Sequence, residues 1–223
     1  ITLQDPLLAN TYLNIGVYDN GQAFGVYWDN NGSHVLVENN GVLRPLAAPD
    51  GVDSSSLRFN NFNSSTGAGY GTYTDSSGVA RNFVEANGVI QAIQIQGTSY
   101  LNRDNSHVLG VNSSGDAFGF YTNGFGQSQS FIFRFAAGAL EQINVFGADQ
   151  TTVSAVSDSG SFAGIYTRAG QVYAFTLTDG NTQSYSISIP GAAAGSSFSV
   201  AGVNGGYLWG SYNNAQLSGP QHW

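Results

Sequence analysis

The chain of 223 residues contains no cysteine, no methionine and no lysine, and its six basic residues are all arginines. Without cysteine it forms neither a disulfide nor a thiolate zinc site, so strand pairing and packing must supply its stability. Its formal net charge of -8 disfavours nucleic acid and anionic membrane surfaces as partners, because both need clustered Lys and Arg. No apolar run reaches the roughly 20 residues that span a bilayer. We therefore expect no nucleic-acid partner and no membrane insertion.

Charged residues of any kind are scarce, at 9% of the chain, whereas Gly, Asn, Ser, Thr and Tyr are abundant. This composition is typical of secreted proteins whose surfaces present neutral hydrogen-bonding groups. We therefore predict an acidic, lysine-free protein that is secreted to the extracellular space or periplasm.

A motif of the form Gly-x-x-x-Gly-x-Tyr occurs five times along the chain. Its tyrosines, Tyr27, Tyr73, Tyr121, Tyr166 and Tyr212, are 46, 48, 45 and 46 residues apart. A period of this length suits a four-stranded propeller blade and is too long for most leucine-rich or helical solenoid repeats. The repeat predicts a single all-β domain over residues 1–223, a five-bladed β-propeller of antiparallel four-stranded blades.

Each repeat divides into four predicted strands, the second of which carries the motif. Asn, Asp, Ser and Gly precede each motif, as in tight hairpin turns. No segment has the apolar period of 3.6 residues that marks a helix, so we expect essentially none. The blade repeats lie near residues 11–51, 57–97, 106–148, 152–192, and 198–223 plus 1–8.

The fifth repeat ends at its third strand, Gln221–Trp223. Its missing fourth strand is predicted at the other terminus, where Ile1–Leu7 aligns with the outer strands Val42–Leu46 and Val89–Ile95. Pairing of the N-terminal strand with the C-terminal blade would close the ring and remove two open sheet edges. A strand from a second molecule would complete the same blade and produce polymers.

Residues 111–121 run Val-Asn-Ser-Ser-Gly to Tyr121, Tyr173-Ala174-Phe175 forms a second segment, and residues 189–192 are Ile-Pro-Gly-Ala. With these segments the repeats resemble those of the extracellular HAF-repeat family of bacterial proteins. The resemblance covers nearly the whole chain. The histidine of the family's eponymous triplet is matched loosely at His34 alone, so the resemblance implies a fold and carries over no histidine function.

In blade number and length the chain also resembles the compact five-bladed lectins of the tachylectin type. This likeness concerns architecture and implies a carbohydrate-binding function only as an expectation. The repeated glycines and tyrosines are interpreted as structural, because Gly in a strand marks a bulge or close backbone approach and Tyr packs between blades.

The expected binding residues follow the repeated tyrosines, where the repeat places a polar ring on one rim. Carboxylates, amides and an Arg bind sugar hydroxyls, and Trp28 offers a flat face for a pyranose. A solvated loop rim is the alternative interpretation. The ring comprises Trp28, Asp29, Asp75, Asn123, Arg168 and Asn214.

A second set of candidates lies in the connections between blades, on the same rim, and includes Asp149. The loop Gly97–Asn105, with Tyr100, Arg103 and Asp104, is the richest of these connections in hydrogen-bond donors and acceptors. Near the start of the inner strands, Arg58 and His107 align at one level in adjacent blades, facing either a channel mouth or a blade interface.

Catalytic and metal chemistry have little support in the sequence. The five inner strands contain no Asp or Glu, whereas propeller glycosidases need two carboxylates across the central funnel. His34, His107 and His222 show no zinc spacing, so we expect neither metal nor cofactor. The sequence thus predicts a non-catalytic, lectin-like protein that binds a glycan or polysaccharide. The alternatives are an adhesive protein that self-assembles through the open seam and, less favoured, a polysaccharide hydrolase or lyase using Asp29 and Asp75.

Overall fold

The computed structural model describes residues 12–17, 23–29, 32–39, 42–46, 49, 56–63, 66–95, 106–178, 181–186, 197–213 and 220–222. Within these ranges the protein is built from antiparallel β-sheets, each formed by consecutive strands. These ranges contain no α-helix, and Phe135–Ala137 form the 3-10 turn η4. The all-β prediction is therefore confirmed for the described part of the chain.

Five sheets follow the five sequence repeats. Sheet 1 comprises β1 (Tyr12–Val17), β2 (Ala23–Asp29), β3 (Gly32–Asn39) and β4 (Val42–Pro45). Sheet 2 comprises β5 (Arg58–Phe62), β6 (Gly69–Thr74), β7 (Ala80–Ala86) and β8 (Val89–Ile93). Sheet 3 comprises β9 (Ser106–Val111), β10 (Ala117–Thr122), β11 (Ser128–Arg134) and β12 (Ala139–Ile143). Sheet 4 comprises β13 (Gln150–Val156), β14 (Phe162–Arg168), β15 (Gln171–Thr178) and β16 (Asn181–Ser186). Sheet 5 comprises β17 (Ser197–Asn204), β18 (Tyr207–Asn213) and β19 (Pro220–His222).

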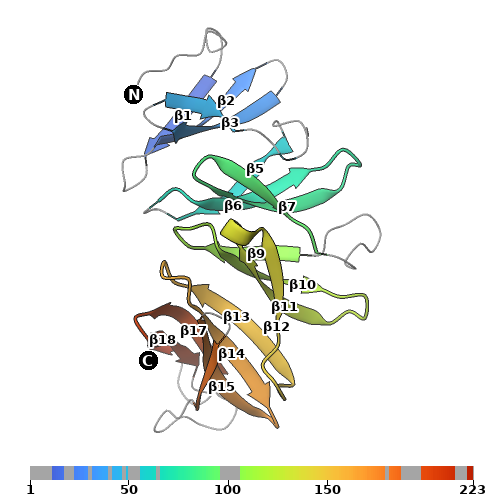
Figure 1. Cartoon of the computed structure of the whole chain (residues 1–223), viewed down its shortest axis with the longest axis vertical. Helices are drawn as coiled ribbons and strands as arrows, with labels where there is room; N and C mark the ends of the chain where they lie inside the picture. The colour runs from blue at the N-terminus through green and yellow to red at the C-terminus, as the bar shows by residue number, and fades with distance from the viewer. Residues whose placement is uncertain are drawn as a thin grey trace.

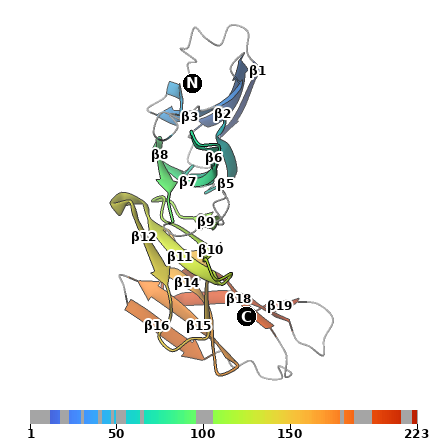
Figure 2. The same ribbon diagram turned by 90° about the vertical axis from the view of Figure 1, so that its right-hand side faces the viewer.

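The sheets follow one another in a row, and sheet 1 lies at the opposite end from sheets 4 and 5 (Figure 1). The row does not close into a ring in this structure, as the view from the side also shows (Figure 2). Sheet 5 has three strands in the order β17-β18-β19, in agreement with a repeat that ends at its third strand. The predicted pairing of residues 1–8 with this sheet lies outside the described residues.

The repeated glycines sit where two backbones approach closely. In sheets 2 to 4 a Cβ on the second motif glycine would lie about 2 Å from a carbonyl oxygen of the first strand, for example 2.0 Å from the His107 oxygen at Gly119. The register of the β9–β10 pair shifts beside that glycine, as at a β-bulge. The structural interpretation of the motif glycines is therefore confirmed.

The motif tyrosines of sheets 2 to 4 pack each of these sheets on the one before it. Tyr121 of sheet 3 joins the cluster of buried side chains that contains Tyr70 and Val84 of sheet 2, and Tyr166 of sheet 4 packs with Phe118 of sheet 3. The opposite face of each sheet receives the next one, because side chains alternate along a strand. This face-to-face stacking is how propeller blades pack, and it leaves the polar turns at the two ends of each sheet.

Polar groups also bridge successive sheets. The Asn82 side-chain amide donates to the Ser106 hydroxyl at 2.7 Å, and the buried Asn112 amide donates to the Ser157 carbonyl at 3.0 Å. In each pair the two residues belong to neighbouring repeats. A buried amide without a partner is costly, so these bonds favour one alignment of each sheet on the next.

Sheet 2 also buries an ionisable group. The Glu85 side chain is only 3% exposed, and its Oε1 accepts a hydrogen bond from the Gly88 backbone N–H at 2.6 Å. Burial raises the pKa of Glu85 to about 7, although the Gly88 hydrogen bond partly opposes the shift. Glu38 of sheet 1 lines the same small cavity, so the charged groups facing this space are both acidic.

The Glu85 carboxyl should make the protein less stable as the pH rises. Between about pH 4.3, where Glu titrates in an unfolded chain, and about pH 7, the folded state holds a proton that the unfolded state has lost. Stability therefore falls across that window and levels off above it. Glu85→Gln should remove most of this pH-dependent loss of unfolding free energy, which amounts to up to a few kcal/mol at pH 8. Thermal melts of both proteins from pH 4 to pH 9 test this, and parallel curves would contradict it.

Candidate functional site

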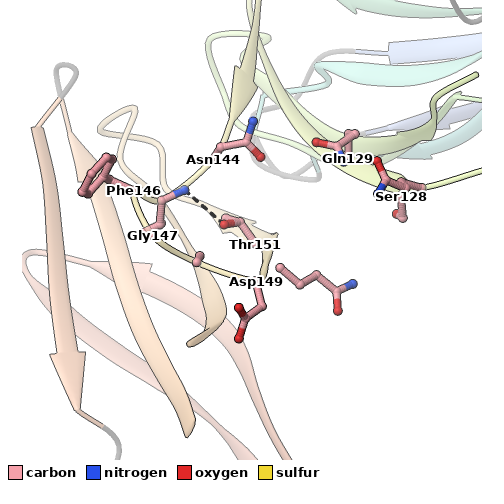
Figure 3. Close-up of a pocket in the computed structure, with 11 residues that line it drawn as sticks. Ser128, Gln129, Asn144, Phe146, Gly147, Asp149 and Thr151 are labelled. Carbon is pink, nitrogen blue, oxygen red and sulfur yellow. Dashed lines mark hydrogen bonds between the residues drawn. The ribbon is translucent and has the colours of Figure 1, made fainter. Parts of the chain in front are cut away.

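A cleft lies between sheets 3 and 4, at the end of the sheets that carries the β10–β11 and β14–β15 turns. Its volume is about 570 Å³, within the range of small-molecule sites. Two segments supply its eleven lining residues (Figure 3): Gln127, Ser128 and Gln129 from one side, and residues 144–151, which connect β12 to β13, from the other.

Phe146 stands at the tip of the connecting segment and is 96% exposed. Its loop is fixed on both sides. The Arg168 guanidinium donates to the carbonyls of Phe146 and Gly147, the latter at 3.1 Å, and stacks on the Tyr166 ring. Gly147 adopts φ 72°, a left-handed conformation that suits glycine, and the Ala148 N–H donates to the Val145 carbonyl to close the turn.

Asp149 and Thr151 hold the other side of the loop. The Asp149 Oδ2 accepts from the Ala169 N–H at 2.9 Å, and the Thr151 Oγ1 accepts from the Val145 N–H at 3.1 Å (Figure 3). An exposed aromatic ring on a segment held by so many bonds is preorganised, which lowers the entropy lost when a ligand binds.

The walls of the cleft are rich in neutral hydrogen-bonding groups. The Gln129 Oε1 accepts from the Gln142 Nε2 at 2.7 Å, which orients the Gln129 amide. Asp149 is the one charged side chain among the eleven lining residues. Amides, hydroxyls and a single carboxylate match a neutral ligand with many hydroxyl groups, and they offer no cation to a phosphate or sulfate.

The predicted ring residue Asp75 is committed to its own hairpin. Its Oδ1 accepts from the Ser77 N–H and hydroxyl and from the Val79 N–H, and its Oδ2 pairs with the Arg81 Nε at 2.9 Å. Hydrogen bonds from Ser77, Val79 and Arg81 hold the pKa of Asp75 well below its usual range. A carboxylate held ionised in this way is unsuited to act as a general acid at neutral pH.

Asn123 closes the equivalent hairpin of sheet 3. Its Oδ1 accepts from the Phe125 and Gln127 N–H groups, both at 3.0 Å, and its Nδ2 donates to the Gln127 side chain at 3.2 Å. Gln127 lines the cleft, so Asn123 positions part of the cleft wall. Phe125, at the tip of the same hairpin, is 91% exposed. The structure thus brings Asn123 and Arg168 to opposite sides of one cleft, where each supports a lining segment.

Arg58 and His107 occupy the same register position in their sheets, opposite Thr72 and Phe120, as the alignment predicts. Both side chains are exposed. The Arg58 Nη1 donates to the Leu57 carbonyl at 2.8 Å, and the His107 ring packs 4.9 Å from the Phe120 ring centroid.

The remaining predicted residues stay untested. Trp28 and Asp29 end β2, and the positions of their side chains lie outside the description. Tyr100, Arg103, Asp104 and Asn214 fall outside the described residues altogether.

Neither Phe146 nor the Gln127–Gln129 wall was among the residues predicted from the sequence. The available signal was weak: Phe146 precedes Gly147 in a connection between repeats, and a Phe in such a place is as easily buried as exposed. Within the described ranges, no three or more His, Asp or Glu side chains gather in a way that would hold a metal ion. None of the described helical segments is long and apolar enough to cross a membrane.

No protein-family model matches the chain, and neither does any curated protein. The resemblance to the HAF-repeat family therefore remains an expectation from the sequence.

The chain is similar to several solved structures at low identity. One is TolB from Acinetobacter baumannii, at 11% identity and a TM-score of 0.39, covering 92% of this chain and 52% of that one, so the chain spans about half of TolB. Another is a mutant of AofleA from Arthrobotrys oligospora, at 12% identity and a TM-score of 0.34 over 96% and 72% of the two chains. A third is a mutant of the Aleuria aurantia lectin AAL in complex with Fucalpha1-6GlcNAc, at 11% identity and a TM-score of 0.35 over 97% and 79%.

Proposed function

We propose that the protein is a secreted, non-catalytic lectin that binds a neutral glycan in the cleft between sheets 3 and 4. Phe146 stacks on one face of a sugar ring, and the amides of Gln127, Gln129 and Asn144 bond its hydroxyls. Asp149 accepts a further hydroxyl through Oδ1, because its Oδ2 already accepts from Ala169. The predicted rim residues Asn123 and Arg168 do not contact the sugar; they position the cleft-lining segments at Gln127 and Gly147.

The observation that carries this proposal is the almost fully exposed Phe146 ring on a loop fixed at both ends. A large apolar ring in water has no stabilising role in the fold. Beside a cleft lined by amides and hydroxyls, it has the two features of sugar recognition: an apolar face for the C–H side of a pyranose and polar partners for its hydroxyls.

The proposal includes a closed, five-bladed ring. Five sheets in sequence order, of which the last has three strands, support it. In the ring, residues 1–8 pair beside β19 as the fourth strand of sheet 5. A closed ring would present several rim clefts at once, and weak sites repeated around a rim gain avidity on a polymeric glycan.

A glycan array tests the proposed function. The protein carries its label at the C terminus, because the chain has no lysine for conventional coupling. Selective binding to a set of related neutral glycans is the expected result. A blank array from a protein with the circular dichroism of a folded β-sheet chain would contradict the lectin function.

Self-assembly is a second candidate, favoured by the outer face of sheet 5. Trp209 lies on Gly202, as Phe118 lies on Gly110 in sheet 3, yet Phe118 is buried by the next sheet and Trp209 is half-exposed. In the proposed ring, sheet 1 of the same chain covers this face. In an assembly, sheet 1 of a second copy covers it. Sedimentation at increasing protein concentration distinguishes the closed ring from the assembly, because only the assembly gains mass.

A further inference from the structure

A second cleft, of about 340 Å³, lies between sheets 4 and 5. It is at the opposite end of sheet 4 from the Phe146 cleft. Ser161 and Thr178 line it, and they stand just before β14 and at the end of β15, whereas the β14–β15 turn belongs to the other end. Because β14 has seven residues, the two clefts are about 20 Å apart along the strands. One sugar ring therefore cannot reach both.

The second cleft exists because two side chains of sheet 4 that face sheet 5 are small. The residue before the second motif glycine pairs with a residue of the third strand, and both are large, apolar and buried in sheets 2 and 3: Tyr70 with Val84, and Phe118 with Ile132. In sheet 4 the same pair is Ala163 with Thr176. Ala163 packs with Val200 and Val203 of sheet 5. The smaller pair leaves space that large side chains fill elsewhere.

One aromatic ring and several neutral polar groups line this space. Tyr185 is 37% exposed, and its hydroxyl donates to the Gln183 Oε1 at 2.8 Å. The Thr178 hydroxyl donates to the Ser161 Oγ, also at 2.8 Å. These bonds orient the groups, and within the described part of the chain the Ser161 hydroxyl and the Gln183 Nε2 donate no bond of their own. Each thus has a proton to offer a ligand, while buried Val203 adds an apolar surface.

None of the seven residues that line the second cleft is charged. An aromatic ring beside hydroxyl and amide groups suits a neutral sugar, and a phosphate or sulfate would find no cation there. The cleft lies at the β17–β18 turn, where it includes Gly206. In the proposed ring, residues 1–8 pair beside β19, which contacts β18 over Ser211–Asn213, at the other end of sheet 5.

We propose that this cleft is a second site for a neutral sugar, so that one molecule holds two glycan chains at opposite rims and cross-links them, an inference that rests on the proposed lectin function. The second site should be the weaker one, because it is smaller and has no carboxylate. Tight binding of a single soluble glycan then reports the Phe146 cleft. Bridging between two glycan-coated surfaces reports both clefts.

Beads coated with the strongest glycan from the array test the second site. Wild-type protein should bind the beads and aggregate them. Tyr185→Ala and Gln183→Ala should each lower the rate of aggregation by about tenfold or more, because bridging needs both sites. Isothermal titration with the soluble glycan should give both variants the wild-type affinity, since their Phe146 cleft is intact. Leu109→Ala, at a half-exposed position of β9 outside both clefts, is the control and should aggregate the beads normally.

Two outcomes would overturn the inference and leave the proposed function standing. One is a wild-type protein that binds the beads without aggregating them. The other is aggregation at the wild-type rate by both variants, which is the result expected if self-association does the bridging. Gln183→Ala removes an exposed amide and no buried packing, so it keeps the test valid if Tyr185→Ala unfolds. Folded wild-type protein that does not bind the beads would overturn the proposed function and this inference together.

Discussion

Phe146→Ala is expected to weaken glycan binding by about tenfold or more, the effect of removing an aromatic anchor worth at least about 1.4 kcal/mol. The ring is 96% exposed in the unbound protein, so its loss removes almost no packing from the fold. Affinity should therefore fall while the thermal midpoint stays unchanged. Isothermal titration with the strongest glycan from the array measures the first quantity, and calorimetric melting measures the second.

Tyr207→Ala is the matched control. Its ring is 79% exposed, but it stands on sheet 5, away from the cleft between sheets 3 and 4. It should bind the glycan with wild-type affinity. Equal losses from the two variants would show that exposed aromatic area in general, and not this cleft, supports binding.

Gly119→Ala should destabilise the fold by about 3 kcal/mol, the upper part of the range for overpacked sites. An added Cβ would meet the His107 carbonyl oxygen at 2.0 Å and the Phe131 ring at 2.8 Å. The carbonyl is backbone in the inner strand of the same sheet, so relief requires that β9 and β10 move apart. Urea unfolding of the variant should show a midpoint well below that of the wild type.

Gly126→Ala separates this steric effect from the conformational cost of replacing a glycine. Gly126 has φ 77°, and a Cβ there would meet no atom within 4 Å. Its substitution should cost about 1 kcal/mol through the left-handed backbone alone. A Gly119→Ala protein as stable as Gly126→Ala would contradict the close approach described for the motif.

The strand pattern could be predicted from the sequence because its cause is local. Only glycine fits where a carbonyl of the first strand passes close to the second strand. The tyrosines and their neighbours point alternately to the two faces of the sheet, which is the period of a strand. The predicted outer strands Val42–Leu46 and Val89–Ile95 correspond to β4 and β8, which end one and two residues earlier. The closure of the ring depends on contacts between distant segments, which no local pattern specifies.

The site was harder to predict, because polar residues on turns have two uses. The sequence Asp75-Ser-Ser-Gly78 already has the chemistry of a turn whose first residue accepts from the following N–H groups. A ring of ligand residues and a ring of turn-closing residues look alike in sequence. Phe146 could not be predicted for a different reason. The exposure of its ring depends on the Arg168 and Asp149 hydrogen bonds that fix its loop.

A crystal structure of the protein soaked with the strongest glycan from the array is the most direct test of the central claim. The account predicts a sugar ring stacked on Phe146, with hydroxyls within hydrogen-bond distance of Gln129 and Asp149, between sheets 3 and 4. A sugar bound elsewhere, such as beside Trp28 or Tyr100, with the Phe146 cleft empty, would contradict it.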